Sequence, residues 1–344
     1  MTECRKKLIH IDSTPFYHIS NYCVRGAYLV NDNPKTKQVD LHRAHWFVDK
    51  LIQLSTIFCI DIAAYTILPR HYHLVLKVNT DNAKNLTSLQ VIERWRQVFN
   101  PHVLAIKYIN KELFSNTEQE QFDEFISQWR ERLTNISWFM RCLNETISRK
   151  VNKEDHCKGA FWQGRFKSQA LLDEPAILAC IMYVDLAPIR EQLAQSLENI
   201  YLSSIQLRVA AFKQAQKEAQ IYDVEGDFLA IAQQPSTLLP FDHMTRSGKQ
   251  IHLPFHLFDY IELIKWTHKG IIENNVPSNQ HNTPKLLTRL TINKKDWINT
   301  CRHFSQHYSH AIGSWQKMCE FSRQFNGKWC KGKKNSQQLH PAHQ

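Results

Sequence analysis

The sequence has no run of apolar residues long enough to cross a membrane, which would need about 20 in succession. Its first residues, Met1 to Lys7, are polar and lack the apolar core of a secretion signal. These two absences predict that the protein has no membrane partner and stays in the cytoplasm.

Paired cysteines are also missing. The nine cysteines are scattered along the chain, with no Cys-x-x-Cys pair. This spacing argues against a zinc ribbon and against a disulfide framework, so ordinary reduced thiols are expected. The sequence also lacks an internal repeat and a low-complexity tract.

What the sequence does contain is a basic, globular composition. Hydrophobic residues make up 43% of the 344 residues, which is enough for a real core, and the length favours two folded units. The formal net charge is +11 and the pI is about 9.2. This balance predicts an anionic partner, and nucleic acid is the one that best fits a chain without a membrane span.

The most informative stretch runs from Ile67 to Val78 and reads as a turn followed by a β-strand. Side chains of a strand alternate between its two faces. The face suited to a core would carry Tyr72, Leu74, Leu76 and Val78. The other face would carry His71, His73, Val75 and Lys77. Two imidazoles on one face can hold a divalent metal, although two exposed strand histidines would give the same pattern.

A second stretch, from Phe161 to Arg190, begins like a strand and continues as a helix. Asp173 or Glu174 is expected to cap the helix, and the helix must end before Pro188. Tyr183 lies in its last turns, among small residues that would let another molecule approach the ring closely. A tyrosine packed on the core side of the helix is the alternative.

Together these stretches resemble a known family. His71-Tyr72-His73, after a Leu-Pro turn, is similar to the HUH motif. Trp162 to Ser168, followed by Tyr183-Val184-Asp185-Leu186-x-Pro188-Ile189-Arg190, resembles the REP-associated tyrosine transposase branch of the single-tyrosine HUH transposases. The resemblance covers roughly residues 10 to 205. It implies an α+β fold, with a ferredoxin-like antiparallel sheet and helices packed on one face. It also implies nicking and rejoining of single-stranded DNA at hairpin-flanked sites.

The expected chemistry is transfer of a DNA phosphodiester to tyrosine. His71 and His73 would hold a divalent metal, magnesium or manganese, that acts on the scissile phosphate. Tyr183 would be the nucleophile and form a covalent phosphotyrosine, which keeps the bond energy for rejoining. The candidates for binding DNA phosphates are Lys77, Arg165, Lys167 and Arg190.

The sequence departs from the family pattern at two positions. Arg70 precedes the first histidine where the family usually has Asn, and Ala187 stands where the family usually has a metal-binding Asn or Gln. Since alanine has no donor atom, the third metal ligand stays open. Asp185, Asp61 or Gln169 is a candidate, and a water molecule is the alternative.

We expect two units. Residues 8–200 would form the transposase domain, with residues 79–150 as a helical insertion, and residues 201–344 a helical accessory domain that reads duplex or hairpin DNA or mediates dimerisation. The C-terminal tail combines basic residues with an aromatic one: Arg323, Lys328, Trp329, Lys331, Lys333 and Lys334. This composition suits contact with DNA or a solvated chain end.

Members of this superfamily are often homodimers, so Tyr183 would meet the histidine pair of its own chain or of a neighbour. Two functions from different classes remain. One is the metal-dependent transposase, and the other is a decayed or domesticated protein that binds hairpin DNA without catalysis. A replication initiator or relaxase with the same histidine pair fits the stretch around Tyr183 less well.

Overall fold

A computed structural model describes residues 9–33, 38–222, 233–242, 252–277, 283–324 and 331–340. The strands are β1 (Phe16–Tyr22), β2 (Asn31–Asn33), β3 (Gln38–Asp40), β4 (Ile60–Ile67), β5 (His71–Val78), β6 (Lys167–Leu171), β7 (Phe241–Asp242), β8 (Leu253–His256) and β9 (Ala311–Ile312). Within the described ranges, no helix combines the length and the apolar composition needed to cross a membrane.

The helices fall into an N-terminal and a C-terminal set. The first set is α1 (His42–Ile57), α2 (Thr80–Asn85), α3 (Ser88–Trp95), α4 (Val103–Ile109), α5 (Asn116–Leu133), α6 (Ile136–Glu154), α7 (Glu174–Asp185) and α8 (Ala187–Arg190). The second set is α9 (Ser204–Tyr222), α11 (Leu257–Ile272), α12 (Lys285–Arg289), α13 (Lys294–His307), α14 (Trp315–Arg323) and α15 (Lys333–Leu339). A short 3-10 helix, η2, spans Leu197–Asn199.

A five-stranded sheet in the order β4-β5-β1-β6-β9 lies at the centre of the molecule. β4 and β5 form the expected antiparallel hairpin, in which Ile67 pairs with Tyr72. β1 pairs antiparallel with both β5 and β6, whereas β9 pairs parallel with β6. The predicted α+β class and the helical C-terminal part are therefore confirmed, and the parallel β9 makes the sheet mixed.

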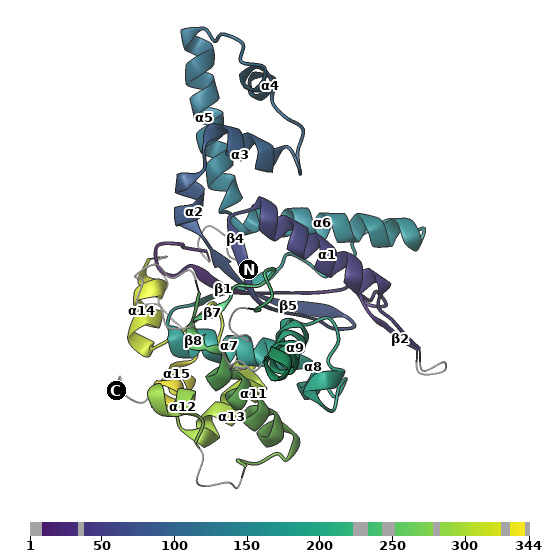
Figure 1. Ribbon diagram of the computed structural model, residues 1–344, viewed down its shortest axis with the longest axis vertical. Coiled ribbons are helices and arrows are strands. Elements are labelled where there is room, and N and C mark those ends of the chain that lie inside the picture. The colour runs from purple at the N-terminus through teal and green to yellow at the C-terminus, as the bar shows by residue number, and fades with distance from the viewer. Residues whose placement is uncertain are drawn as a thin grey trace.

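Helices cover both faces of this sheet, and not one face as expected (Figure 1). One face packs against α1 and α6, with Tyr72, Leu74 and Leu76 of β5 in its core. The other face packs against α7 and the C-terminal helices, with Val75 of β5 in its core. This second layer of helices forms because apolar side chains of the C-terminal helices pack against α7.

The two predicted units are closely joined at this second layer. Trp297 and Phe304 of α13 share one core with Ala179 and Val184 of α7. Arg208 of α9 donates to the carbonyl oxygens of Ala63 in β4 and Leu239, at 2.9 and 3.0 Å. The C-terminal residues thus contribute to the surroundings of the sheet residues on this face.

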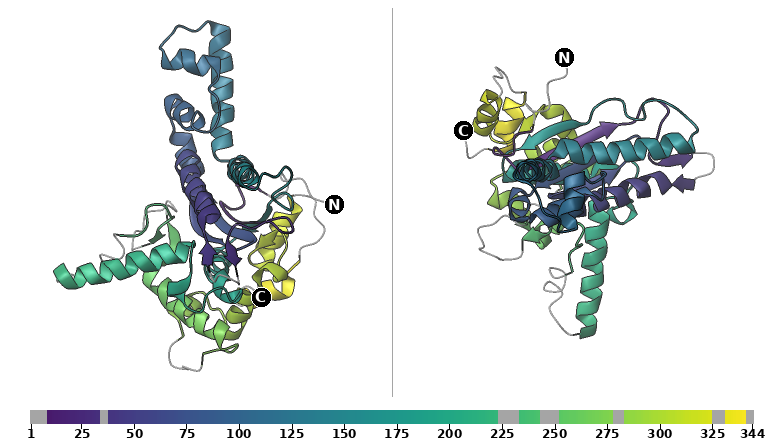
Figure 2. Two further views of the ribbon diagram at one scale, coloured as in Figure 1. Left: turned by 90° about the vertical axis from the view of Figure 1, so that its right-hand side faces the viewer. Right: turned by 90° about the horizontal axis from the view of Figure 1, so that it is seen from above.

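Two segments project from the body. Helices α3, α4 and α5, within the predicted insertion, form an arm that extends away from the sheet (Figure 1). Figure 2 shows α9 extending from the body in another direction. Lys333 and Lys334 of the predicted basic tail begin α15, and Lys331 lies two residues before it. Lys328 and Trp329 lie outside the described residues.

Candidate metal centre and tyrosine site

The histidine pair lies on the sheet face that packs against α7. The alternation predicted for β5 is observed, because Tyr72, Leu74, Leu76 and Val78 enter the core on the α1 side. His71 and His73 are both buried, with 9% and 2% of their surface exposed. They are therefore not two exposed strand residues.

A carboxylate completes a group of three donors. The Nε2 atom of His71 lies 3.1 Å from Oε1 of Glu191, which is more exposed than the two imidazoles. His71, His73 and Glu191 each offer one ligand atom, and these atoms all lie within 4.8 Å of one another. Two imidazoles and a carboxylate of this spacing can hold a metal ion.

The donor atoms fit a metal in a second respect. Nε2 of His73 is buried and has no hydrogen-bond partner among the described residues. Burial, together with the nearby His18 and His71, lowers the pKa of His73 well below its ordinary value. The imidazole is therefore neutral near pH 7, which is the form that binds metals.

Glu191 was not among the candidates drawn from the sequence. Its backbone N–H donates to the carbonyl of Ala187 at 2.9 Å, so it lies one helical turn beyond the position where the family usually has its ligand. A carboxylate therefore lies four residues after position 187, where the sequence has no donor atom. This spacing is the signal in the sequence that could have identified it.

The three candidates for a third ligand have other partners. Asp185 lies outside the group: its carboxylate accepts hydrogen bonds from Ser204 and from Tyr260 in the interior of the C-terminal helices. Burial raises the pKa of this carboxyl group. The side chain of Asp185 points away from the Tyr183 ring, because residues two positions apart on a helix lie on nearly opposite sides.

Asp61 and Gln169 are also engaged with other side chains. Asp61 pairs with Lys77 in the β4–β5 register and accepts from Asn79 at 3.5 Å. Gln169 of β6 contacts a third histidine, His18 of β1, with 2.7 Å between Oε1 and Nδ1. Nε2 of His18 in turn lies 3.1 Å from Nδ1 of His73. No local pattern in the sequence indicates this role of His18, because its contact with His73 depends on the pairing of β1 with β5.

Tyr183 lies next to the histidine pair of its own chain. Its ring centroid is 5.4 Å from that of His73 and 6.0 Å from that of His18. Asp173 caps α7 as expected, since its side chain accepts from the backbone N–H of Ala176. The helix that begins there carries Tyr183 to the sheet.

The ring of Tyr183 is less accessible than expected. It is 6% exposed and stacks on Phe304 of α13, with the centroids 5.2 Å apart. The small residues of α7, Ala179 among them, lie in the core shared with α13. They serve helix packing and do not leave an open approach to the ring.

Arg190 covers the other side of this tyrosine. Its guanidinium carbon lies 3.7 Å from the centroid of the Tyr183 ring, and Nη1 donates to the Tyr183 carbonyl at 2.7 Å. Nη2 is buried and has no hydrogen-bond partner among the described residues. Burial lowers the pKa of the guanidinium, which nevertheless stays charged at neutral pH. A buried cation with an open donor is suited to an anionic ligand.

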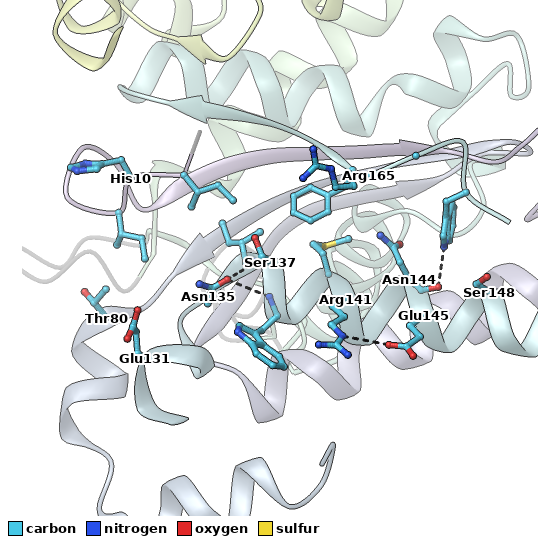
Figure 3. A pocket seen from close by; sticks show the side chains of 18 of the residues that line it. His10, Thr80, Glu131, Asn135, Ser137, Arg141, Asn144, Glu145, Ser148 and Arg165 are labelled. Atoms are coloured by element: carbon cyan, nitrogen blue, oxygen red, sulfur yellow. Dashed lines mark hydrogen bonds and ion pairs between the residues drawn. The ribbon is translucent and has the colours of Figure 1, made fainter. Parts of the chain in front are cut away.

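The other predicted DNA-binding residues are dispersed. Lys167 is exposed on β6, with Nζ 5.7 Å from the ring centroid of Tyr22, and Tyr22 stacks on His71 at 4.6 Å. Lys77 is buried farther along β5, where burial lowers its pKa. Arg165 precedes β6 and lines a cavity of about 1120 Å³ on the α6 side, together with Arg141 and Asn144 (Figure 3). The structure therefore brings Arg190 and Lys167, but not Arg165, to the side of the histidines.

Comparison with known proteins gives one distant similarity. Neither a protein-family model nor a curated protein matches this chain. Among solved structures, the chain is similar to a REP-associated tyrosine transposase bound to a REP hairpin. The TM-score is 0.35 and the identity 12%, over 61% of this chain and 86% of that chain. Because the similarity is distant, the chemistry of this chain has to follow from its own side chains.

Proposed function

We propose that this protein is a metal-dependent tyrosine transposase that nicks and rejoins single-stranded DNA. The observation that carries the proposal is the meeting of three elements at one place: the His71–His73–Glu191 group, the phenol of Tyr183 and the guanidinium of Arg190. A phosphodiester transfer needs a site for a cation, a nucleophile and a fixed positive charge.

His71, His73 and Glu191 would hold the divalent metal, magnesium or manganese. When bound, the metal would supply Lewis-acid stabilisation of the charge that develops on the scissile phosphate. The carboxylate of Glu191 is a ligand that suits both ions, and the open Nε2 of His73 is a ligand that suits a transition-metal ion such as manganese. The stacking of Tyr22 on His71 would restrict the orientation of that imidazole.

Tyr183 would provide the nucleophile. Its phenolic oxygen would form a bond to phosphorus while the bond from phosphorus to one bridging DNA oxygen breaks. The phenolic proton leaves the tyrosine, and the released DNA oxygen takes up a proton, so no water is consumed. The reverse reaction with another DNA end rejoins the strand.

Arg190 would hold a non-bridging oxygen of the same phosphate. Its open Nη2 lies in a water-poor setting, where a charged donor stabilises an anion more strongly than in bulk water. Lys167, exposed near Tyr22 and His71, would contact the next phosphate along the strand. The net charge of +11 supports DNA as the partner.

The proposal includes recognition of hairpin or repeat DNA. Residues 201–344 would form the helical accessory unit, and the assembly would be a homodimer. A solved structure to which this chain is distantly similar was determined with a REP hairpin, which gives a first substrate to test. Since Tyr183 lies against its own histidines, each chain would carry a complete site even in a dimer.

One observation favours a second function, a hairpin-DNA-binding protein without catalysis. Phe304 is fully buried and stacks on Tyr183, so the phenol is covered by α13. A decayed transposase could keep its DNA-binding surface while the nucleophile becomes part of the core.

Covalent capture separates the two functions. The protein would be mixed with labelled single strands from the DNA that flanks its own gene, with and without manganese, and run on a denaturing gel. We expect a manganese-dependent adduct that is absent with Tyr183→Phe and with duplex substrate. Tyr201→Phe is the matched control, because Tyr201 is 56% exposed and lies outside the site. Hairpin binding in a native gel without any adduct would support the non-catalytic function.

A further inference from the structure

We infer that Gln169 and His18 are positioning residues, which hold His73 in the tautomer that leaves its Nε2 lone pair open for the metal. The inference rests on the proposed metal centre. It concerns a row of three side chains across three neighbouring strands, Gln169 on β6, His18 on β1 and His73 on β5.

The row begins at a group that fixes the amide of Gln169. Nε2 of Gln169 donates to the backbone carbonyl of Tyr308 at 3.4 Å. A carbonyl oxygen only accepts, so the NH₂ end of the amide must face Tyr308. Oε1 then faces Nδ1 of His18 at 2.7 Å, and because Oε1 also only accepts, this nitrogen must carry a proton.

The protonation of His18 determines that of His73. His18 is 3% exposed, and its ring nitrogens contact Gln169 and His73 and not a carboxylate. A charged imidazole would therefore be buried without a counter-ion, so the neutral form is favoured. A neutral imidazole with a proton on Nδ1 accepts at Nε2. Nδ1 of His73, 3.1 Å away, therefore donates to it, and Nε2 of His73 carries only a lone pair.

The result matches the geometry at the far end of the row. Nε2 of His73 is the buried atom without a hydrogen-bond partner among the described residues, and it belongs to the group that can hold a metal. Metal-binding histidines commonly donate their other ring N–H to a fixed acceptor, which sets both tautomer and orientation. Here the acceptor is a second histidine, and the carbonyl of Tyr308 anchors the row from the C-terminal part of the chain.

The tautomer can be tested on the full-length, metal-free protein. Histidine ring nitrogens labelled with ¹⁵N would be assigned with His18→Leu and His73→Leu, and their tautomers read from two-bond ¹H–¹⁵N correlations near pH 7. We expect a proton on Nδ1 and none on Nε2 for both His18 and His73. A proton on Nε2 of His73 would overturn the inference.

Metal affinity provides the second readout. We expect His18→Leu to weaken Mn²⁺ binding, measured by calorimetry, by about 10- to 100-fold. His18→Gln should recover most of the loss, because its side-chain carbonyl can accept from Nδ1 of His73. Gln169→Leu should weaken binding in the same direction, and Ser168→Ala, whose side chain points to the other face of β6, should leave it unchanged.

The outcomes separate this inference from the proposed function. If His73 has the expected tautomer but Zn²⁺, added as a diamagnetic probe, leaves its Nε2 signal unshifted, the metal centre fails while the positioning row stands. If His18→Leu keeps both the tautomer of His73 and the wild-type Mn²⁺ affinity, the row has no positioning role even in a working enzyme.

Discussion

The two faces of strand β5 differ in how they treat buried polar atoms. On the face under α1 and α6, the hydroxyl of Tyr72 donates to Asn144 at 2.9 Å. On the opposite face, Nε2 of His73 is buried without a partner, and Nη2 of the neighbouring Arg190 has none either among the described residues. A buried polar group left unpaired costs about 1–3 kcal/mol. The first face pairs its buried hydroxyl within the protein, whereas the second leaves a buried acceptor and a buried donor that a bound ligand would satisfy.

Neighbouring residues of β5 offer the sharpest test of this contrast. We expect His73→Leu to weaken Mn²⁺ binding at least about 100-fold while the free energy of unfolding changes little, because removal of the unpaired Nε2 offsets the loss of the hydrogen bond from Nδ1 to His18. Leu74→Ala should do the reverse, lowering the free energy of unfolding by about 2–5 kcal/mol and leaving Mn²⁺ affinity unchanged. Calorimetry and urea unfolding measure the two quantities.

The opposite pattern would break the comparison. If His73→Leu unfolds as readily as Leu74→Ala and both bind Mn²⁺ like the wild type, then the histidine is a packing residue. Both faces of β5 would in that case contribute to packing, and neither would bind a metal.

Asp185 tests whether a polar group on the α7 side can also be purely structural. Its carboxylate accepts from Ser204 and Tyr260, and it lies close to the charge of the buried Arg208. We expect Asp185→Leu to lower the free energy of unfolding by about 3 kcal/mol, since it leaves Arg208 without its counter-charge. Mn²⁺ affinity should not change, because Asp185 lies outside the metal group. A loss of Mn²⁺ binding in the still-folded variant would return Asp185 to the list of ligands.

Glu191 has a smaller expected effect because it is exposed. We expect Glu191→Gln to weaken Mn²⁺ binding about tenfold, since an amide oxygen carries no charge, with no change in unfolding. Glu198→Gln is the matched control, an exposed carboxylate that pairs with Lys213 away from the histidines. Equal affinities of the two variants would show that Glu191 is only a surface partner of His71.

The sequence was informative wherever a local pattern decides the structure. Alternation along β5 predicted which side chains share a face, and Asp173 with Pro175 predicted where α7 begins. These features depend on backbone geometry and capping, which are set by residues close together in the chain.

Contacts between distant segments could not be predicted in the same way. His18 meets His73 only through the register of β1 with β5, and Phe304 covers Tyr183 only because α13 packs on α7. The parallel pairing of β9 with β6 has the same origin. Glu191 lies between the two cases, since its helical spacing from Ala187 is local but its meeting with His71 is not.

Ala187 gives the smallest expected effect and the most direct test of where the third ligand lies. If Glu191 supplies the ligand one turn beyond the family position, then Ala187→Asn adds nothing to the site. Ala187 is fully buried, so the larger polar side chain should instead lower the free energy of unfolding by about 1–3 kcal/mol, with Mn²⁺ affinity and covalent capture unchanged. A clear gain in adduct formation would mean that position 187 faces the metal and that the natural site works at reduced strength. Combining Ala187→Asn with Glu191→Gln sharpens the reading, because an asparagine that binds the metal would restore the affinity that the loss of the carboxylate removes, whereas one buried in the core would not.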